Sequence, residues 1–101
     1  MLGAHRLCDK GPYLYDELLR VPFIARIPGT TRAGERRQEW VYNFDLMPTF
    51  IETGGGNIPT GLDASSILPL MRGEASREEV MFGEFHGHQV PVSMRVIRTA
   101  D

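Results

Sequence analysis

Apolar residues recur at intervals of three and four between positions 44 and 51, which is the spacing of one helical face. A proline limits where this helix can begin, because its missing N–H is harmless only within the first turn. The sequence therefore predicts a helix with Asp45 as N-cap, Pro48 in its first turn and Gly54 as a left-handed stop. The apolar residues of the predicted face are Phe44, Met47, Phe50 and Ile51.

Two other segments combine a proline near a helix start with a defined stop. Ser66 is a good N-cap, Pro69 falls in the first turn and Gly73 ends the segment, so we expect a second, short helix there. Pro12 can occupy a first-turn position, and residues 13–20 then form a third predicted helix. That helix is expected to end at Arg20, because Val21 precedes Pro22 and therefore avoids helical geometry.

Three segments have the composition of strands. The continuous apolar run at residues 23–27 is bounded by turn residues and predicts a strand buried on both faces. Residues 80–85 and 92–99 are rich in β-branched and aromatic side chains, and Gly87 and Pro91 lie between them. We interpret this pair as antiparallel neighbours, with polar and glycine-rich loops joining the other elements.

The composition is that of a folded protein, with 42% hydrophobic and 24% charged residues in 101. A net charge of -2 gives no electrostatic basis for binding nucleic acid or an anionic membrane. No apolar run approaches the length of about 20 residues that crosses a bilayer, and no secretion signal opens the chain, so the sequence does not indicate a compartment. Cys8 is the only cysteine, which excludes an intrachain disulfide and a thiolate metal cluster.

The first 29 residues contain an ordered series of motifs. Residues 2–5 are Leu-Gly-Ala-His, Lys10 follows, residues 15–16 are Tyr-Asp, and residues 21–29 form an apolar segment that ends in Pro-Gly. This order resembles the sulfatase family just after its second metal-binding motif. The resemblance extends over nearly the whole chain, through residues 61–63 and 67–73, and ends with residues 82–85 and 94–99.

The resemblance implies an α/β fold, namely a fragment of an alkaline-phosphatase-like sulfatase sandwich plus the start of a small antiparallel sheet. Residues 1–73 are then the C-terminal part of the catalytic domain, and residues 74–101 begin the smaller subdomain. The implied activity is hydrolysis of sulfate esters, in small molecules or sulfated glycans, by a formylglycine nucleophile and a divalent metal such as calcium. Because the motifs begin only a few residues after the expected metal-binding pair, we expect a truncated N-terminus.

Lys10 is the candidate catalytic residue. The family pattern implies that this lysine contacts the bound sulfate. A sulfate ester develops negative charge on its oxygens as the S–O bond breaks, so a fixed ammonium group there lowers the barrier. Without the pattern, a solvated surface lysine would be the simplest interpretation.

The three histidines are weaker candidates. His86 and His88 lie two apart at the end of a predicted strand, so their side chains would face the same way. No third metal ligand is evident, and a polar strand end is the simplest interpretation. In sulfatases the junction to the smaller sheet often lies near the substrate opening, which makes this pair candidate substrate contacts rather than metal ligands. His5 fills the histidine position of the family pattern and is interpreted as part of the loop scaffold.

The groups that would complete such a site are not in this sequence. The formylglycine signature, Cys/Ser-any-Pro/Ala-any-Arg, does not occur, and Cys8 lacks that context. No expected metal ligand is present either, so we expect the isolated chain to hydrolyse no sulfate ester. Two alternatives stay open: a phosphodiester or phosphonate hydrolase of the same superfamily, and a non-catalytic truncated interaction domain, oligomeric through its uncovered strand edges.

Overall fold

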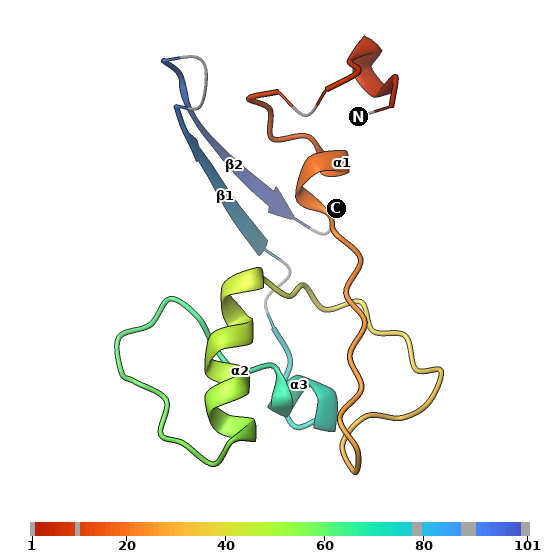
Figure 1. Ribbon diagram of the computed structural model, residues 1–101, viewed down its shortest axis with the longest axis vertical. Helices are drawn as coiled ribbons and strands as arrows, with labels where there is room; N and C mark the ends of the chain where they lie inside the picture. Colours follow the sequence, from red (N-terminus) through yellow and green to blue (C-terminus); the bar gives the residue numbers. More distant parts are fainter. Residues whose placement is uncertain (1, 10, 78–79, 88–90, 100–101) are drawn as a thin grey trace. The chain divides into compact units, whose positions relative to one another are not determined.

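The computed structural model describes residues 2–9, 11–77, 80–87 and 91–99, which form two units (Figure 1). The first unit comprises Met1–Ile24 and Val80–Asp101, and the second comprises Ala25–Glu79. The first contains η1 (Ala4–Arg6), α1 (Asp16–Leu19), β1 (Val80–His86) and β2 (Ser93–Thr99), and the second contains η2 (Asn43–Asp45), α2 (Leu46–Thr53) and α3 (Leu68–Arg72). The predicted mixture of helices with a small antiparallel sheet is confirmed. None of the described helices is long and apolar enough to cross a membrane.

Helix α2 begins where the sequence predicts, with Pro48 as its third residue and Asp45 as the residue before it. The Asp45 carboxylate does not cap α2, however, because its Oδ2 accepts a hydrogen bond from the backbone N–H of Tyr42, at 2.8 Å. The prediction for Gly54 is wrong, since its φ is -80°. Gly55, with φ 74°, takes the left-handed position one residue later.

Helix α3 follows its prediction more closely, although Ile67, and not the predicted N-cap Ser66, is the residue directly before it. Ser66 Oγ accepts a hydrogen bond from the Leu68 N–H at 3.2 Å, and Pro69 lies in the first turn. Gly73 ends the helix with φ 74°. The Glu74 N–H donates to the Pro69 carbonyl at 2.9 Å, which is the long bond of a left-handed helix stop.

The core of the second unit lies where α3 meets α2. Ile67 and Leu68 are 2% and 3% exposed, and Leu70 is also buried. Thr49 Oγ1 on α2 accepts a hydrogen bond from the Ile67 N–H at 3.0 Å and donates to the Asp45 carbonyl at 2.6 Å. Helix α2 thus buries its Pro48 and Thr49 side, while three of the four residues of its apolar face, Phe44, Met47 and Phe50, are exposed.

Strands β1 and β2 form the antiparallel pair that the sequence predicts, and Figure 1 shows them side by side. The register runs from Val80 opposite Thr99 to His86 opposite Ser93. Phe82 and Ile97 face each other across the pair and are 63% and 66% exposed. Among the described residues this hairpin is the whole sheet.

Two predictions for the early part of the chain need correction. Residues 23–27 form no strand, and Ile24 is 93% exposed instead of buried. A strand buried on both faces needs neighbouring strands and covering layers, and the described residues supply neither for this segment. Helix α1 covers only Asp16–Leu19, because Tyr15 adopts an extended conformation (φ -72°, ψ 153°).

Candidate functional site

The structure places only part of the predicted site. Lys10 and His88 lie outside the described residues. His86 is described at the end of β1, where its Nε2 lies 2.8 Å from Glu84 Oε2. Its side chain is 59% exposed, so the His86 ring is largely open to solvent.

Glu84 lies within an exposed charge cluster on the hairpin. Besides its contact with His86, its Oε1 lies 2.9 Å from Arg95 Nε on β2. The hydrogen bond with His86, and then the positive charge of Arg95, hold the pKa of Glu84 below its ordinary value of 4.5. The cluster therefore favours an ionised Glu84 beside the imidazole.

His5 is joined to two residues near the start of α1. Its ring stacks on Tyr15, with ring centroids 3.9 Å apart and an angle of 11° between the planes. Its Nε2 lies 3.3 Å from Glu17 Oε2, in the first turn of α1. The pKa of Glu17 lies below its ordinary value of 4.5, first because its own backbone N–H bonds the carboxylate and then because of the His5 hydrogen bond.

The backbone around His5 is strained. His5 and Arg6 have φ angles of 53° and 60°, in the left-handed region that non-glycine residues rarely occupy. Each such residue costs roughly 1–2 kcal/mol. The turn is closed by a hydrogen bond from the Gly3 N–H to the Leu7 carbonyl at 3.0 Å. The His5–Tyr15 stack, worth about 1 kcal/mol, offsets part of this strain.

The segment after Lys10 approaches the same aromatic residues. Gly11 has φ 53°, and a Cβ at this position would lie 2.6 Å from Tyr13 Cε2. Only glycine allows this close approach without displacing the ring. The Tyr13 and Tyr15 rings are themselves in contact, with centroids 5.6 Å apart. We call His5, Tyr13 and Tyr15 the aromatic cluster.

A buried ion pair in the second unit was not predicted from the sequence. The Asp45 carboxylate, 2% exposed, accepts a hydrogen bond from Arg77 Nη1. The same guanidinium donates to the Trp40 carbonyl, at 3.2 Å, and to Ser65 Oγ. The Arg77 charge is thus paired with a buried carboxylate, and three guanidinium N–H groups donate to the surrounding chain, which fits a structural role.

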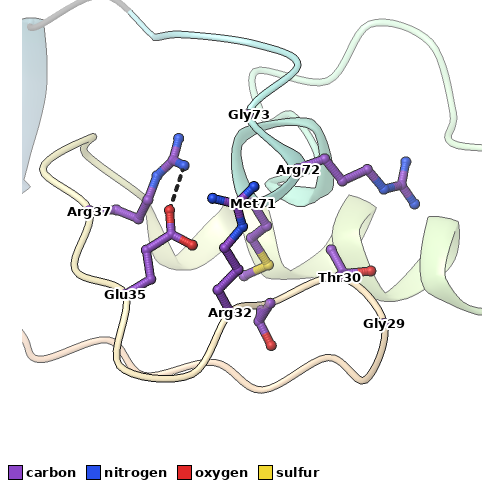
Figure 2. Close-up of a pocket in the computed structure, with 9 residues that line it drawn as sticks. Gly29, Thr30, Arg32, Glu35, Arg37, Met71, Arg72 and Gly73 are labelled. Atoms are coloured by element: carbon purple, nitrogen blue, oxygen red, sulfur yellow. Dashed lines mark hydrogen bonds and ion pairs between the residues drawn. The ribbon is translucent and has the colours of Figure 1, made fainter.

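A pocket of about 570 Å³ also lies in the second unit (Figure 2). It opens between the loop after residue 28 and the end of α3. Figure 2 shows the Arg32 guanidinium directed toward Met71. The lining residues are Gly29, Thr30, Thr31, Arg32, Glu35, Arg37, Met71, Arg72 and Gly73, and none of them was predicted as a site residue.

The positive charge of this pocket is largely compensated by its surroundings. Arg37 Nη1 lies 3.0 Å from Glu35 Oε1, and its Nη2 bonds Glu39. Arg72 Nη1 lies 3.9 Å from carboxylate oxygens of both Glu52 and Glu74. Two of the three guanidiniums thus have acidic neighbours, so the pocket is a weak candidate for binding an anion.

The described residues contain no group of three or more His, Cys, Asp or Glu side chains that could hold a metal ion. The acidic and histidine side chains that do meet, such as His5 with Glu17 and His86 with Glu84, are pairs. A divalent metal therefore does not fit the part of the chain that the structure describes.

Comparison with known proteins identifies related sequences. The chain matches the family model described as N-sulphoglucosamine sulphohydrolase, C-terminal, over residues 3–100. It is 39% identical to the Ulvan-active sulfatase of Formosa agariphila over 56 residues, which are 55% of this chain and 11% of that protein. Its alignment with the uncharacterized sulfatase YidJ of Escherichia coli K12 spans 99 residues at 37% identity. That alignment covers 91% of this chain and 19% of that protein.

A third relative belongs to a broader group. The multifunctional alkaline phosphatase superfamily protein PehA of Trinickia caryophylli is 35% identical over 71 residues, which are 69% of this chain and 14% of that protein. The chain thus spans less than a fifth of the length of each of these three relatives. Together with the family match, they confirm the resemblance seen in the sequence motifs.

Proposed function

The chain belongs to the N-sulphoglucosamine sulphohydrolase C-terminal family, and from that membership we propose that it forms part of an enzyme that hydrolyses sulfate esters. In this proposal Lys10 is the catalytic cation that faces the sulfate group of the substrate. The observation that carries the proposal is the family match over residues 3–100, which includes the ordered motifs around Lys10. Because the chain spans less than a fifth of its relatives, the activity belongs to the whole protein.

Lys10 would act by stabilising charge. Negative charge grows on the non-bridging and leaving oxygens as the S–O bond breaks, and a positioned ammonium group binds that state more tightly than the ground state. At a distance of about 4 Å, one ion pair gives about 1 kcal/mol in water and about 4 kcal/mol at an effective dielectric constant of about 20. The contribution of Lys10 therefore depends on how well the complete site excludes water.

Other residues of the complete protein would supply the remaining groups. We propose that they carry the formylglycine nucleophile and the ligands of a divalent cation, calcium in the simplest case, which would neutralise charge on the sulfate. The described residues offer no such ligand set, so no step is assigned to the ion in this chain. Residues 1–73 would complete the catalytic domain, and residues 74–101, with the β1–β2 hairpin, would begin the smaller one.

The proposed substrate is a sulfated saccharide or a small sulfate ester. The name of the Ulvan-active sulfatase from Formosa agariphila supports a saccharide. His86 and His88 are proposed to contact the substrate beyond its sulfate group, and the exposure of the His86 ring supports this role. Such contacts should affect KM more than kcat, because they do not touch the reacting atoms.

The test uses the product of the complete reading frame that contains these residues, assayed with 4-methylumbelliferyl sulfate and with sulfated saccharides. Lys10→Ala is expected to lower kcat/KM by about 100-fold, the effect of losing one preorganised charge-stabilising group. Lys10→Arg keeps the charge and should retain part of the activity. Arg36→Ala, in an exposed loop, is the control and should change nothing. Full activity of Lys10→Ala, or no sulfate-ester hydrolysis by the complete protein, would contradict the proposal.

One second candidate is a phosphodiester or phosphonate hydrolase. The similarity to PehA supports it, because the name of that protein places it in the alkaline phosphatase superfamily. A phosphate ester is also a tetrahedral anion, so Lys10 would serve it by the same charge stabilisation. The same preparation assayed with bis(4-nitrophenyl) phosphate and a phosphonate monoester separates the two candidates. A higher kcat/KM for the phosphorus substrates than for the sulfate ester would favour this candidate.

A further inference from the structure

We propose that His5 is a positioning residue, which holds the loop that leads to Lys10 against the start of α1. This inference rests on the proposed role of Lys10. His5 lies five residues before that lysine, and its contacts are with Tyr15 and Glu17, which follow it. One imidazole therefore joins the chain on the two sides of the proposed catalytic residue.

The two contacts of His5 restrain different motions. Stacking on Tyr15, with centroids 3.9 Å apart, fixes the height and tilt of the imidazole plane. The 3.3 Å contact between Nε2 and Glu17 Oε2 fixes its rotation within that plane. Glu17 lies in the first turn of α1 and Tyr15 is the residue directly before it, so both partners move with that helix. A ring restrained in both ways fixes the backbone from which it projects.

The strained backbone is the second observation. His5 and Arg6 both have positive φ angles, a conformation that persists only where surrounding contacts over-determine it. Three backbone hydrogen bonds close the turn: from the Gly3 N–H to the Leu7 carbonyl at 3.0 Å, from the Arg6 N–H to the Gly3 carbonyl at 3.1 Å, and from the Leu7 N–H to the Ala4 carbonyl at 3.0 Å. The contacts of the His5 ring with Tyr15 and Glu17 add to them. If the ring were removed, the turn should relax to ordinary negative φ angles and redirect the following residues.

The chain after Lys10 meets the same aromatic cluster. A Cβ at Gly11 would lie 2.6 Å from the Tyr13 ring, so any side chain at this position would displace that ring. The Tyr13 ring in turn contacts Tyr15. The described residues before and after Lys10 are therefore attached to one group of rings. Removing His5 should disturb the upstream attachment while the downstream one remains.

NMR spectroscopy of the 101-residue chain tests the structural part. His5→Ala is expected to shift the backbone amide signals of residues 3–9 and to raise their fast motion, while signals of the β1–β2 hairpin stay in place. Arg37→Ala, which breaks an exposed ion pair in the second unit, is the matched control and should leave residues 3–9 unchanged. Unchanged signals for residues 3–9 in His5→Ala would overturn the proposal.

Kinetics of the complete protein test the link to Lys10. His5→Ala is expected to lower kcat/KM about tenfold, whereas in a Lys10→Ala background it should change kcat/KM less than about twofold. His5→Phe, which keeps the stacking on Tyr15, should be more active than His5→Ala. Independent effects of the two substitutions, or equal impairment of the Phe and Ala variants, would show that His5 does not position Lys10.

The two proposals fail in different ways. A Lys10→Ala variant with full activity would remove the proposed function, whatever His5 does to the loop. A strongly impaired Lys10→Ala variant combined with independent effects at His5 would remove only the positioning role.

Discussion

Asp45 accepts hydrogen bonds from three separate parts of the chain. Its carboxylate takes the N–H of Tyr42, the N–H of Ser65 at 3.1 Å, and a guanidinium N–H of Arg77. The residue is 1% exposed, so these bonds replace the water that an ionised carboxylate would otherwise need. A single buried side chain thereby ties the start of α2 to segments 20 and 32 residues further along.

Removing the partner of this carboxylate should be costly. Arg77→Ala is expected to lower the free energy of unfolding by about 3 kcal/mol, because it leaves a buried carboxylate without its charge partner. Urea denaturation followed by the fluorescence of Trp40, the only tryptophan, measures the change. Arg36→Ala removes an exposed arginine and should leave the midpoint in place. Equal midpoints for the two variants would mean that the Asp45–Arg77 pair does not stabilise the fold.

Residues of this kind are hard to predict because their roles depend on partners that are distant in sequence. Local spacing predicts Asp45 as a helix cap, but its bond to Arg77 spans 32 positions, and no local pattern encodes it. The left-handed backbone of His5 is equally hidden, since glycine is the residue that normally signals it. Lys10 was identified from the order of motifs, and its role stays a prediction.

At the level of elements, both longer helices end in the same way. The Gly56 N–H bonds the Ile51 carbonyl and the Glu74 N–H bonds the Pro69 carbonyl, each at 2.9 Å. In both cases the residue before that donor is a glycine with φ 74°. These glycines satisfy carbonyl groups that would otherwise be left without partners at the helix end.

Gly73 offers a clean test of this helix stop. A Cβ at this position would meet nothing within 4 Å, so Gly73→Ala changes backbone strain without creating a clash. It is expected to cost about 1 kcal/mol and to lower Tm by about 5 °C in a thermal unfolding experiment. Gly73→Asn should lose less, because asparagine tolerates the left-handed conformation. An Ala variant as stable as the wild type would show that α3 does not need this stop.

The hairpin should weaken in acid because of Glu84. The pKa of Glu84 is lowered in the folded state, so the ionised carboxylate stabilises the hairpin above the ordinary value of 4.5. That stabilisation is lost as the pH falls from 4.5 through the lower folded-state pKa. Amide signals of β1 and β2, followed by NMR from about pH 6 to about pH 2, should show this loss. Glu84→Gln should abolish this part of the pH dependence, and a variant with the wild-type profile would contradict the assignment.

Prolines and glycines explain why the helices were predicted better than the strand at residues 23–27. Pro48 and Pro69 restrict helix starts through their own backbone chemistry, which operates in any context. The hairpin also carries its own partner, since β1 and β2 are close in sequence. Residues 23–27 have the composition of a buried strand, but pairing and burial depend on other segments, and composition alone does not provide them.

For the molecule as a whole, the described residues bury little apolar surface. Ile67, Leu68 and Leu70 are the buried hydrophobic residues, whereas Phe50 and Ile24 are 69% and 93% exposed. Burial of apolar surface is the main stabilising contribution in folding, so such a small core gives limited rigidity. Electrostatic catalysis requires groups held in place before the reaction, and this chain by itself offers few means to hold them.

The isolated 101-residue chain is therefore expected to hydrolyse no sulfate ester, with or without added Ca²⁺. Its sequence lacks the formylglycine signature, its described residues contain no set of metal ligands, and Lys10 alone would stabilise charge without a nucleophile to attack sulfur. The assay compares this chain with the product of the complete reading frame on 4-methylumbelliferyl sulfate at equal concentration. Ca²⁺-dependent turnover by the isolated chain would contradict this expectation if the Lys10→Ala substitution abolished that turnover. The 101 residues would then form a working site by themselves. Turnover that survives Lys10→Ala would instead indicate a contaminating sulfatase, so this variant serves as the control for the purity of the preparation.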